Sequence, residues 1–440
     1  MKIRYIYGSE ILDSRGNPTI QVELGTDNCD AIAKVPSGKS TGQKEAVELR
    51  DDDKKRYHGK GVLKAVKNVN EIINKEIIKN DFFADEQNEI DQFLIELDGT
   101  NNKAKLGANA ILGVSMASAR CAAKEYGMPL YKYLGGVSAN CLPIPMLNII
   151  NGGEHADNSI DFQEFMIVPL GAKSFKEAIR WSSETFHELE KILKSKNEPT
   201  TLGDEGGFAP NITTNQAIEL ISQAITNCNY KLGKNGIAIA IDCAANSFYD
   251  EKEKLYKFHD ETNLNSEKKI SRTSKELVAY LGELINKYPQ IISIEDPFYE
   301  KDDAGFKEFT KLYGHKIQIV GDDIFVTNPK ITKKGIEQKL ANSVLIKVNQ
   351  IGTVSETIQT INLAKNNNWT TVISHRSGET TDTFIADLAV GFNSVYIKSG
   401  SMSRSERVVK YNRLMEIEDE LGDSATYQGI AMVKKLNKNA

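Results

Sequence analysis

Short apolar runs that each end in polar residues recur through the C-terminal two thirds of the chain. The runs are GIAIAID to Asp242, IISIED to Glu295 and Asp296, IQIVGDD to Asp322 and Asp323, SVLIKVN with Lys347, TTVISH to His375, and SVYIKSG with Lys398. From Glu295 onward the polar positions follow one another every 23 to 28 residues, about the length of one strand and one helix. This pattern predicts alternating strands and helices.

Helical spacing between the runs supports this interpretation. SKELVAYLGELINKY and TVSETIQTINLAKNNN have helical spacing and lie between successive apolar runs. Repeated strand and helix units imply a parallel sheet, and this number of units favours a closed (β/α) barrel. Active sites of such barrels lie at the carboxyl ends of the strands, so we expect the polar ends to converge at one opening.

The first part of the chain has a different organisation. Strand-like runs with turn residues open it, and residues 61–79 and 104–126 have helical spacing. The segment LGGVSANCLPIPM then has the glycine and proline content of a domain junction. We therefore expect an α/β protein with an N-terminal α+β cap, residues 1–137, and a C-terminal barrel, residues 138–440.

Composition narrows the class of protein. The 440 residues are 40% hydrophobic, and 55 basic and 60 acidic residues are interspersed with a net charge of −5. This balance indicates neither nucleic acid nor membrane as a partner. The five cysteines form no CxxC pair and the N-terminus lacks an apolar signal segment, so we expect a reducing, cytoplasmic location.

The acidic strand ends suggest a metal site. Asp242, Glu295 and Asp322 follow successive runs, and carboxylates without a Cys or His cluster suit Mg²⁺. The alternative is that each acid separately caps a helix or forms a salt bridge.

Lys347 raises a related question, because buried strands rarely contain an ammonium group. It is either an edge residue that reaches solvent or a group held in a low-dielectric pocket.

Other segments suggest a phosphate-binding site and mobile loops. His375, Arg376 and Ser377 could bind phosphate, although SHRS would also suit a surface turn. The glycine-rich segments NGGEHADNSIDFQEF and TLGDEGGFAPN could be lids or ordinary surface loops. VPSGKSTG is not a nucleotide-binding P-loop, since Ala33 replaces the required glycine and Pro36 interrupts the loop.

Ordered motifs from about residue 5 to residue 422 resemble the enolase family. They are DSRGNPT, the VPSG and STG pair around Lys39, NGGEHA, QEF, GDEGGFAPN, SIEDP, GDD followed by TNP, LIKVNQIG, SHRSGET and RSER. The resemblance implies a barrel with an irregular ββαα start, which would account for the longer step of 53 residues from Asp242 to Glu295.

The resemblance also implies a reaction and a set of site residues. The reaction is the Mg²⁺-dependent, reversible dehydration of 2-phospho-D-glycerate to phosphoenolpyruvate in glycolysis and gluconeogenesis. Lys347 matches the base at C2 and Glu205 the acid at the C3 hydroxyl. The metal positions are Asp242, Glu295 and Asp322 for a first Mg²⁺ and Ser40 for a second that accompanies substrate; the substrate positions are His155, Gln163, Glu164, Ser374, His375, Arg376, Ser377 and Lys398.

These roles are chemically consistent. Removing a proton next to a carboxylate adds a second negative charge to it, and two Mg²⁺ ions with Lys398 would stabilise that charge. The same cations should lower the pKa of Lys347 towards the working pH. A lysine base with Mg²⁺ is also the arrangement that general accounts give for enolase-superfamily sites.

Two alternatives and two departures accompany the resemblance. A racemase or cycloisomerase of the superfamily would carry a Lys-x-Lys pair where this chain has Gln163 and Glu164, and a non-catalytic binding role would not need the intact site. Lys39 and the segment 401–403 depart from the family pattern. The family suggests a homodimer or an octamer; display at the cell surface is not readable from the sequence.

Overall fold

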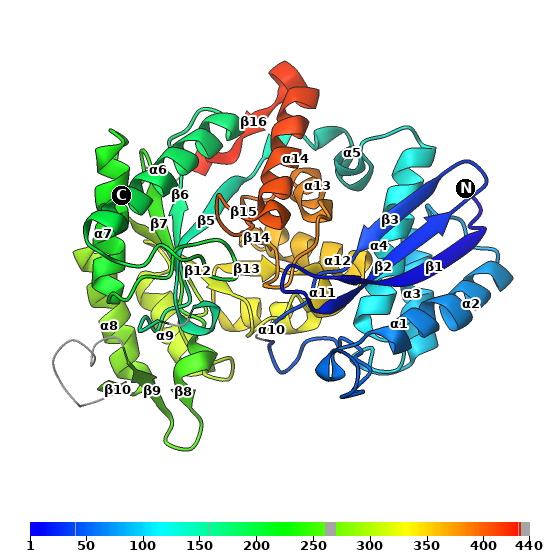
Figure 1. Ribbon diagram of the computed structural model, residues 1–440, viewed down its shortest axis with the longest axis horizontal. Coiled ribbons are helices and arrows are strands. Elements are labelled where there is room, and N and C mark those ends of the chain that lie inside the picture. Colours follow the sequence, from blue (N-terminus) through cyan, green and yellow to red (C-terminus); the bar gives the residue numbers. More distant parts are fainter. Residues whose placement is uncertain (40, 157, 260–269, 430, 433–440) are drawn as a thin grey trace.

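The computed structural model describes residues 1–39, 41–156, 158–259, 270–429 and 431–432, and Figure 1 shows their arrangement. Ser40 therefore lies outside the described residues. Every described helix is too short or too polar to cross a lipid bilayer.

The chain begins with a three-stranded antiparallel sheet in the order β1-β2-β3. Its strands are β1 (Tyr5–Leu12), β2 (Pro18–Gly25) and β3 (Asp30–Lys34). The turn between β1 and β2 is held by Asp13, whose side chain accepts from the backbone of Arg15 and Asn17 at 2.8 and 2.9 Å. Gly16 in this turn has a φ of 74°, a conformation that glycine adopts without strain.

Helices pack on this sheet and complete the cap (Figure 1). They are η1 (Tyr57–Gly59), α1 (Leu63–Lys67), η2 (Asn68–Ile73), α2 (Asn74–Lys79), α3 (Gln87–Asp98), α4 (Ala108–Glu125), α5 (Leu130–Gly135) and η3 (Gly136–Ser138). A Cβ on Gly113 of α4 would lie 2.4 Å from Val22, so this small residue allows the helix to approach β2 closely. The helical segments predicted at 61–79 and 104–126 are confirmed, with α4 beginning after Gly107.

Eight strands then form a closed barrel in the order β5-β6-β7-β11-β12-β13-β14-β15. Their bounds are β5 (Ile144–Asn151), β6 (Glu164–Val168), β7 (Ala238–Asp242), β11 (Ile291–Glu295), β12 (Gln318–Gly321), β13 (Ser343–Ile346), β14 (Thr370–Ser374) and β15 (Tyr396–Lys398). β5, β6, β7, β11 and β13 are buried along their whole length, as expected for apolar strands covered on both faces.

The barrel begins irregularly. β5 pairs antiparallel with β6 and β6 antiparallel with β7, whereas the remaining pairs are parallel. Two helices, α6 (Phe175–Ser195) and α7 (Thr214–Asn227), separate β6 from β7. The predicted ββαα start and the barrel class are therefore confirmed. Because β6 runs in the opposite direction, its first residue, Glu164, pairs with the last residue of β7, Asp242.

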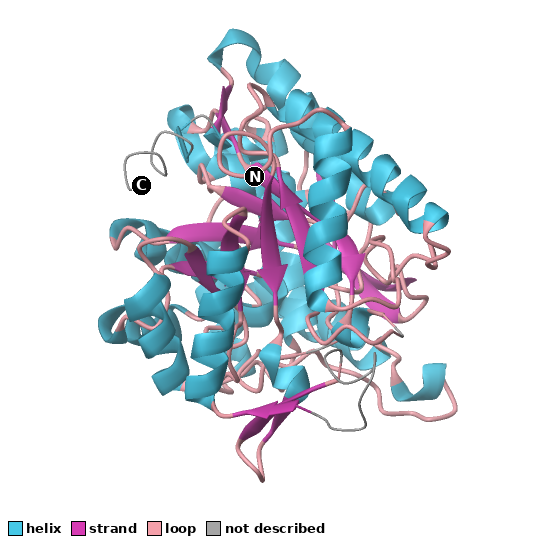
Figure 2. Cartoon of the chain, turned by 90° about the vertical axis from the view of Figure 1, so that its left-hand side faces the viewer, coloured by secondary structure: helices cyan, strands magenta, loops and turns pink. Residues whose placement is uncertain are grey.

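Helices surround the barrel strands (Figure 2). They are α6 (Phe175–Ser195), α7 (Thr214–Asn227), α8 (Ser274–Lys287), α9 (Asp303–Tyr313), α10 (Pro329–Gln338), α11 (Val348–Ile351), α12 (Val354–Asn366), α13 (Phe384–Gly391) and α14 (Ser405–Leu421). Thr213 and Thr273 begin α7 and α8 with capping boxes, in which the threonine side chain and the residue three positions later exchange hydrogen bonds.

Short elements lie between these helices and strands. They are β4 (Cys141–Leu142), η4 (Gly153–His155), η5 (Ala245–Phe248), β8 (Tyr249–Asp250), β9 (Leu255–Phe258), β10 (Ile270–Arg272), η6 (Gly422–Ser424) and β16 (Thr426–Tyr427). The chain leaves η3 of the cap at Ser138 and reaches β5 at Ile144. The boundary between residues 137 and 138 stays a prediction.

Candidate active site

A polar pocket with an empty volume of about 430 Å³ lies at the carboxyl ends of the barrel strands. It is lined by His155, Gln163, Glu164, Glu205, Asp242, Ala244, Asp296, Asp322, Asp323, Lys347, Ser374, His375, Arg376, Ser377 and Lys398. Every described residue of the predicted site is in this set except Glu295, which joins the cluster through Lys398. The fold thus brings together side chains that are up to 243 positions apart, from His155 to Lys398.

Lys398 holds three carboxylates of the pocket together. Its Nζ donates to Asp242 Oδ2 and Glu295 Oε1, each at 2.9 Å, and lies 3.2 Å from Glu164 Oε2. Burial alone would lower the pKa of Lys398, but these carboxylates raise it well above its usual value. Burial raises the pKa of Glu295 and Glu164, and neighbouring acids add to the effect. Lys398 is therefore a buried cation inside an acidic cluster.

Lys347 forms an ion pair with Asp322 because each residue directly follows a strand, β13 and β12, and these strands are neighbours. Gln350 donates to the other oxygen, Asp322 Oδ1, at 2.8 Å. Burial lowers the pKa of Lys347, but Asp322 outweighs this effect and holds the pKa above its ordinary value. Lys347 is thus a pocket residue and not an edge residue. The expected lowering of its pKa by bound cations stays a prediction.

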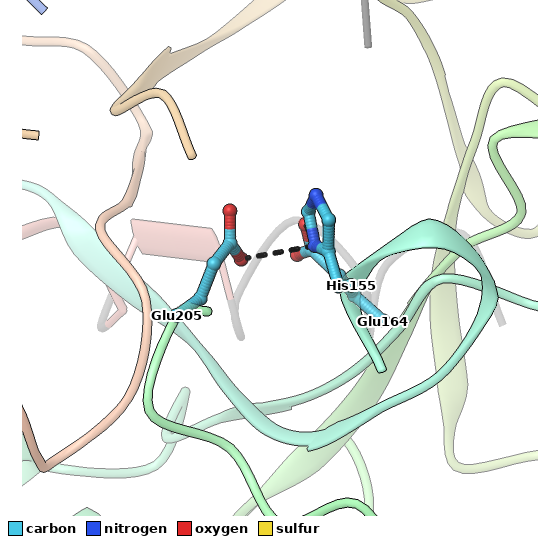
Figure 3. Close-up of side chains that lie close together, drawn as sticks. All are labelled: His155, Glu164 and Glu205. Carbon is cyan, nitrogen blue, oxygen red and sulfur yellow. Dashed lines mark ion pairs between the residues drawn. The ribbon is translucent and has the colours of Figure 1, made fainter. Parts of the chain in front are cut away.

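Glu205 lies in the pocket between two histidines, His155 and His375. Its Oε1 is 3.2 Å from His375 Nε2, and its Oε2 is 3.7 Å from His155 Nδ1 (Figure 3). Asn148 Nδ2 also donates to Oε2 at 3.0 Å. Burial by itself would raise the pKa of Glu205, but the two rings hold it well below its usual value. Glu164 completes the group, 3.6 Å from His155 Nδ1.

The proton position on His375 follows from its neighbour Arg407. Arg407 is 0% exposed, and its Nη1 lies 2.6 Å from His375 Nδ1. A guanidinium group only donates hydrogen bonds, so Nδ1 must accept. Burial lowers the pKa of His375 to about 4, so the ring is neutral at pH 7 and its one N–H is on Nε2, facing Glu205.

The cap contributes a loop to the side of the pocket formed by Arg376 and Ser377. The backbones of Ser37 and Gly378 exchange hydrogen bonds of 2.7 and 2.9 Å, and Arg376 donates to Glu45 at 2.8 Å. A Cβ on Gly38 would lie 2.1 Å from the Arg376 guanidinium, so a larger residue at this position would displace that group. No described helix begins between Ser37 and Tyr57, which agrees with the rejection of a P-loop.

Lys39 connects three loops around the pocket. Its Nζ donates to the carbonyl of Glu154 at 2.8 Å and to Asp204 Oδ2 at 3.3 Å. Glu154 precedes His155 and Asp204 precedes Glu205, so this departure from the family pattern lies beside two pocket residues.

The acidic residues of the pocket fit a hard cation. The Oε2 atom of Glu295 is buried and has no hydrogen-bond partner among the described residues, so its lone pairs are available to a cation. Asp296, Asp322 and Asp323 also offer carboxylate oxygens within 4.8 Å of one another. Such an oxygen-rich set suits Mg²⁺. Of the predicted trio Asp242, Glu295 and Asp322, this group contains Asp322, and the metal role of all three stays a prediction. Asp296 also accepts from the backbone of Asp322 and Asp323 at 2.8 Å.

Sequence reasoning did not single out several residues that hold the site. These are Asn148, Gln350, Arg407 and Glu45. The RSER motif that contains Arg407 belongs to the resemblance, but no pattern along the chain indicates that Arg407 reaches His375.

Two family models match the chain. The model described as the enolase N-terminal domain matches residues 3–134, and the model described as the enolase C-terminal TIM barrel domain matches residues 139–436. These domains imply a lyase-type enzyme with a small-molecule substrate, and the family usually uses metal ions. Because the two matches cover nearly the whole chain in the expected order, the chain belongs to the enolase family.

Proposed function

We propose that this protein catalyses the reversible dehydration of 2-phospho-D-glycerate to phosphoenolpyruvate, a step of glycolysis and gluconeogenesis. The observation that carries the proposal is that Lys347 and Glu205, a candidate base and a candidate acid, line one pocket together with the acidic cluster and Lys398. The reaction needs these groups because it removes a weakly acidic C–H proton and expels a hydroxyl group.

In this proposal Lys347 Nζ accepts the proton from C2. The reaction requires neutral Lys347, whereas Asp322 favours the protonated form. Asp322 is also a proposed metal ligand, so a metal would reduce the hold of this carboxylate on Lys347. Lys398, a buried cation, stabilises the second negative charge that develops on the substrate carboxylate.

Glu205 then donates a proton to the C3 hydroxyl, which leaves as water. The two histidines favour the ionised form of Glu205. Glu205 can therefore donate a proton only if the bound substrate favours its protonated form. A substrate that carries a phosphate and a carboxylate brings negative charge, which raises the pKa of a nearby acid. His155, Gln163 and Glu164 border the same space, and we assign them to the substrate pocket.

The phosphate would bind beside Ser374, His375, Arg376 and Ser377, where a guanidinium and hydroxyl groups meet. Asp242, Glu295 and Asp322 would hold one Mg²⁺, and Ser40 would help to hold a second with substrate. When bound, Mg²⁺ supplies positive charge that stabilises the developing dianion.

The direct test is to add 2-phosphoglycerate and Mg²⁺ to the purified protein and follow the ultraviolet absorbance of phosphoenolpyruvate. We expect activity in the native protein and in Lys333→Ala, a control at an exposed lysine of α10, and loss of activity in Lys347→Ala. An absorbance change no larger than that of Lys347→Ala would refute the proposal.

We also propose a cytoplasmic location and a homodimer or octamer. Light scattering of the purified protein would distinguish these two assemblies from a monomer.

A further inference from the structure

Two cysteine side chains face each other in the cap, outside the barrel pocket. Cys29 ends the turn between β2 and β3, and Cys121 lies in α4. Their Sγ atoms are 3.2 Å apart although the residues are 92 positions apart in the sequence. Figure 1 shows β2, β3 and α4 together in this part of the molecule.

Backbone contacts hold the two thiols in place. The Cys29 carbonyl accepts from the backbone N–H of Thr26 at 2.9 Å, which closes the turn. Cys29 Sγ lies 3.5 Å from the Cys121 carbonyl, and Cys121 Sγ lies 3.8 Å from the Cys29 carbonyl. Each thiol thus approaches the backbone of the other residue, so the facing arrangement is built into the contact between turn and helix.

The surroundings of the pair favour thiol chemistry over metal binding. The groups of described residues that could hold a metal ion include neither Cys29 nor Cys121. Cys121 is fully buried, whereas Cys29 is only half-buried and is the thiol that a small solute can reach. Burial raises the pKa of Cys121 to about 12, with a further contribution from Cys29, so little of Cys121 is present as the reactive thiolate.

We propose that Cys29 and Cys121 are a redox-sensitive pair that hydrogen peroxide converts to a disulfide. The Cys29 sulfur attacks one peroxide oxygen, the O–O bond breaks, and the products are a sulfenic acid and one water. The Cys121 sulfur then attacks the Cys29 sulfur and displaces hydroxide, which takes the Cys121 proton and leaves as a second water. Two thiols are oxidised and one peroxide is reduced.

The required movement is small. The sulfur atoms must approach from 3.2 Å to the ~2.05 Å of a disulfide, a change within reach of side-chain rotation. The bond would join the turn to a helix in which most side chains are buried. Because it would close a long segment of chain, it should restrict the unfolded state and raise the thermal midpoint.

The test uses the full chain treated with hydrogen peroxide, followed by blocking of free thiols and peptide mapping without reduction. We expect a Cys29–Cys121 cross-linked peptide, a fall from five titratable thiols to three, and full reversal by dithiothreitol. The thermal midpoint of the oxidised protein should rise and return to its starting value on reduction.

Single variants separate the two roles. Cys121→Ser should leave a sulfenic acid on Cys29 that dimedone traps, and Cys228→Ser, a control at another half-buried cysteine, should retain the cross-link. Five unchanged thiols, or a cross-link that needs Cys228 or joins two chains, would overturn the proposal. The mapping of the native protein decides the question even if a variant fails to fold, and the result does not depend on the reaction in the barrel.

Discussion

Arg407 on α14 donates to Nδ1 of His375, and this contact determines which ring nitrogen faces Glu205 with a proton. His375 follows β14 and Arg407 lies 32 positions later. Arg407 also donates to the Ser377 carbonyl at 2.6 Å, so it holds the loop as well as the ring. Arg407 is thus a positioning residue, which would act on the reaction through His375.

The first prediction concerns this contact. In Arg407→Met the donor to Nδ1 is lost, so we expect part of His375 to shift to the Nδ1–H form and kcat to fall by at least about tenfold, which corresponds to about 1.4 kcal/mol in the barrier. Arg407→Lys, which keeps a donor, should lose less. Nitrogen NMR of ¹⁵N-histidine protein reports the tautomer, and His375→Gln identifies its signals among the six histidines. An unchanged tautomer in Arg407→Met would show that another contact controls the ring.

The second prediction separates the catalytic roles proposed for Lys347 and Glu205. Glu205→Gln should still exchange the C2 hydrogen of 2-phosphoglycerate with deuterated solvent but should fail to release water. Lys347→Ala should lose both exchange and dehydration, because the base acts first. Mass spectrometry of the recovered substrate measures the exchange. Full exchange in Lys347→Ala would mean that another group is the base.

The third prediction concerns Lys398 as a cation among the proposed metal ligands. Lys398→Met leaves Asp242 and Glu295 without their buried partner, so unfolding in a chelator should become easier by about 3–5 kcal/mol. Because the lysine no longer repels a cation, added Mg²⁺ should raise the thermal midpoint more in the variant than in the native protein.

Lys333→Met, at an exposed position on α10, is the matched control and should behave as the native protein does. Calorimetry with chelator and with Mg²⁺ provides the comparison. Equal Mg²⁺ shifts in Lys398→Met and in the control would argue against competition between Lys398 and the metal.

The fourth prediction is a dependence of stability on pH. The pKa of His375 falls from 6.5 to about 4 on folding, so between these values the unfolded chain binds more protons than the native protein. The free energy of unfolding should therefore rise with pH across this window. The stability that His375 contributes should be complete above pH 6.5 and lost as the pH falls to 4. Over this window the free energy of unfolding should fall by roughly 3 kcal/mol.

Denaturant titrations of native protein and His375→Gln at several pH values, all with chelator, measure this contribution. The other ionisable groups are common to both proteins, and Glu205 loses one of the two rings that lower its pKa, so the difference between the stabilities reports His375 together with its effect on Glu205. Parallel pH profiles would show that His375 does not change its pKa on folding.

Hydrophobic patterning determined much of the fold. Short, mainly apolar runs form strands that are buried on both faces, and helices lie between them as predicted. Because the carboxyl ends of parallel strands meet at one end of a barrel, the same pattern placed Asp242, Asp322, Lys347 and Lys398 together. Glu164 could not be placed in this way, since it begins an antiparallel strand, and it was identified only through the family motif.

The partner of each of these side chains depends on the packing of the whole chain. The charge on Lys347 depends on Asp322, the tautomer of His375 on Arg407, and the approach of Cys29 to Cys121 on the contact between a turn and α4. The elements and the residue types at the strand ends follow from local sequence, because the period of apolar positions is a local property. Local sequence could not determine these pairings, because distances and electrostatic interactions between side chains far apart in the chain exist only after the helices and strands have packed.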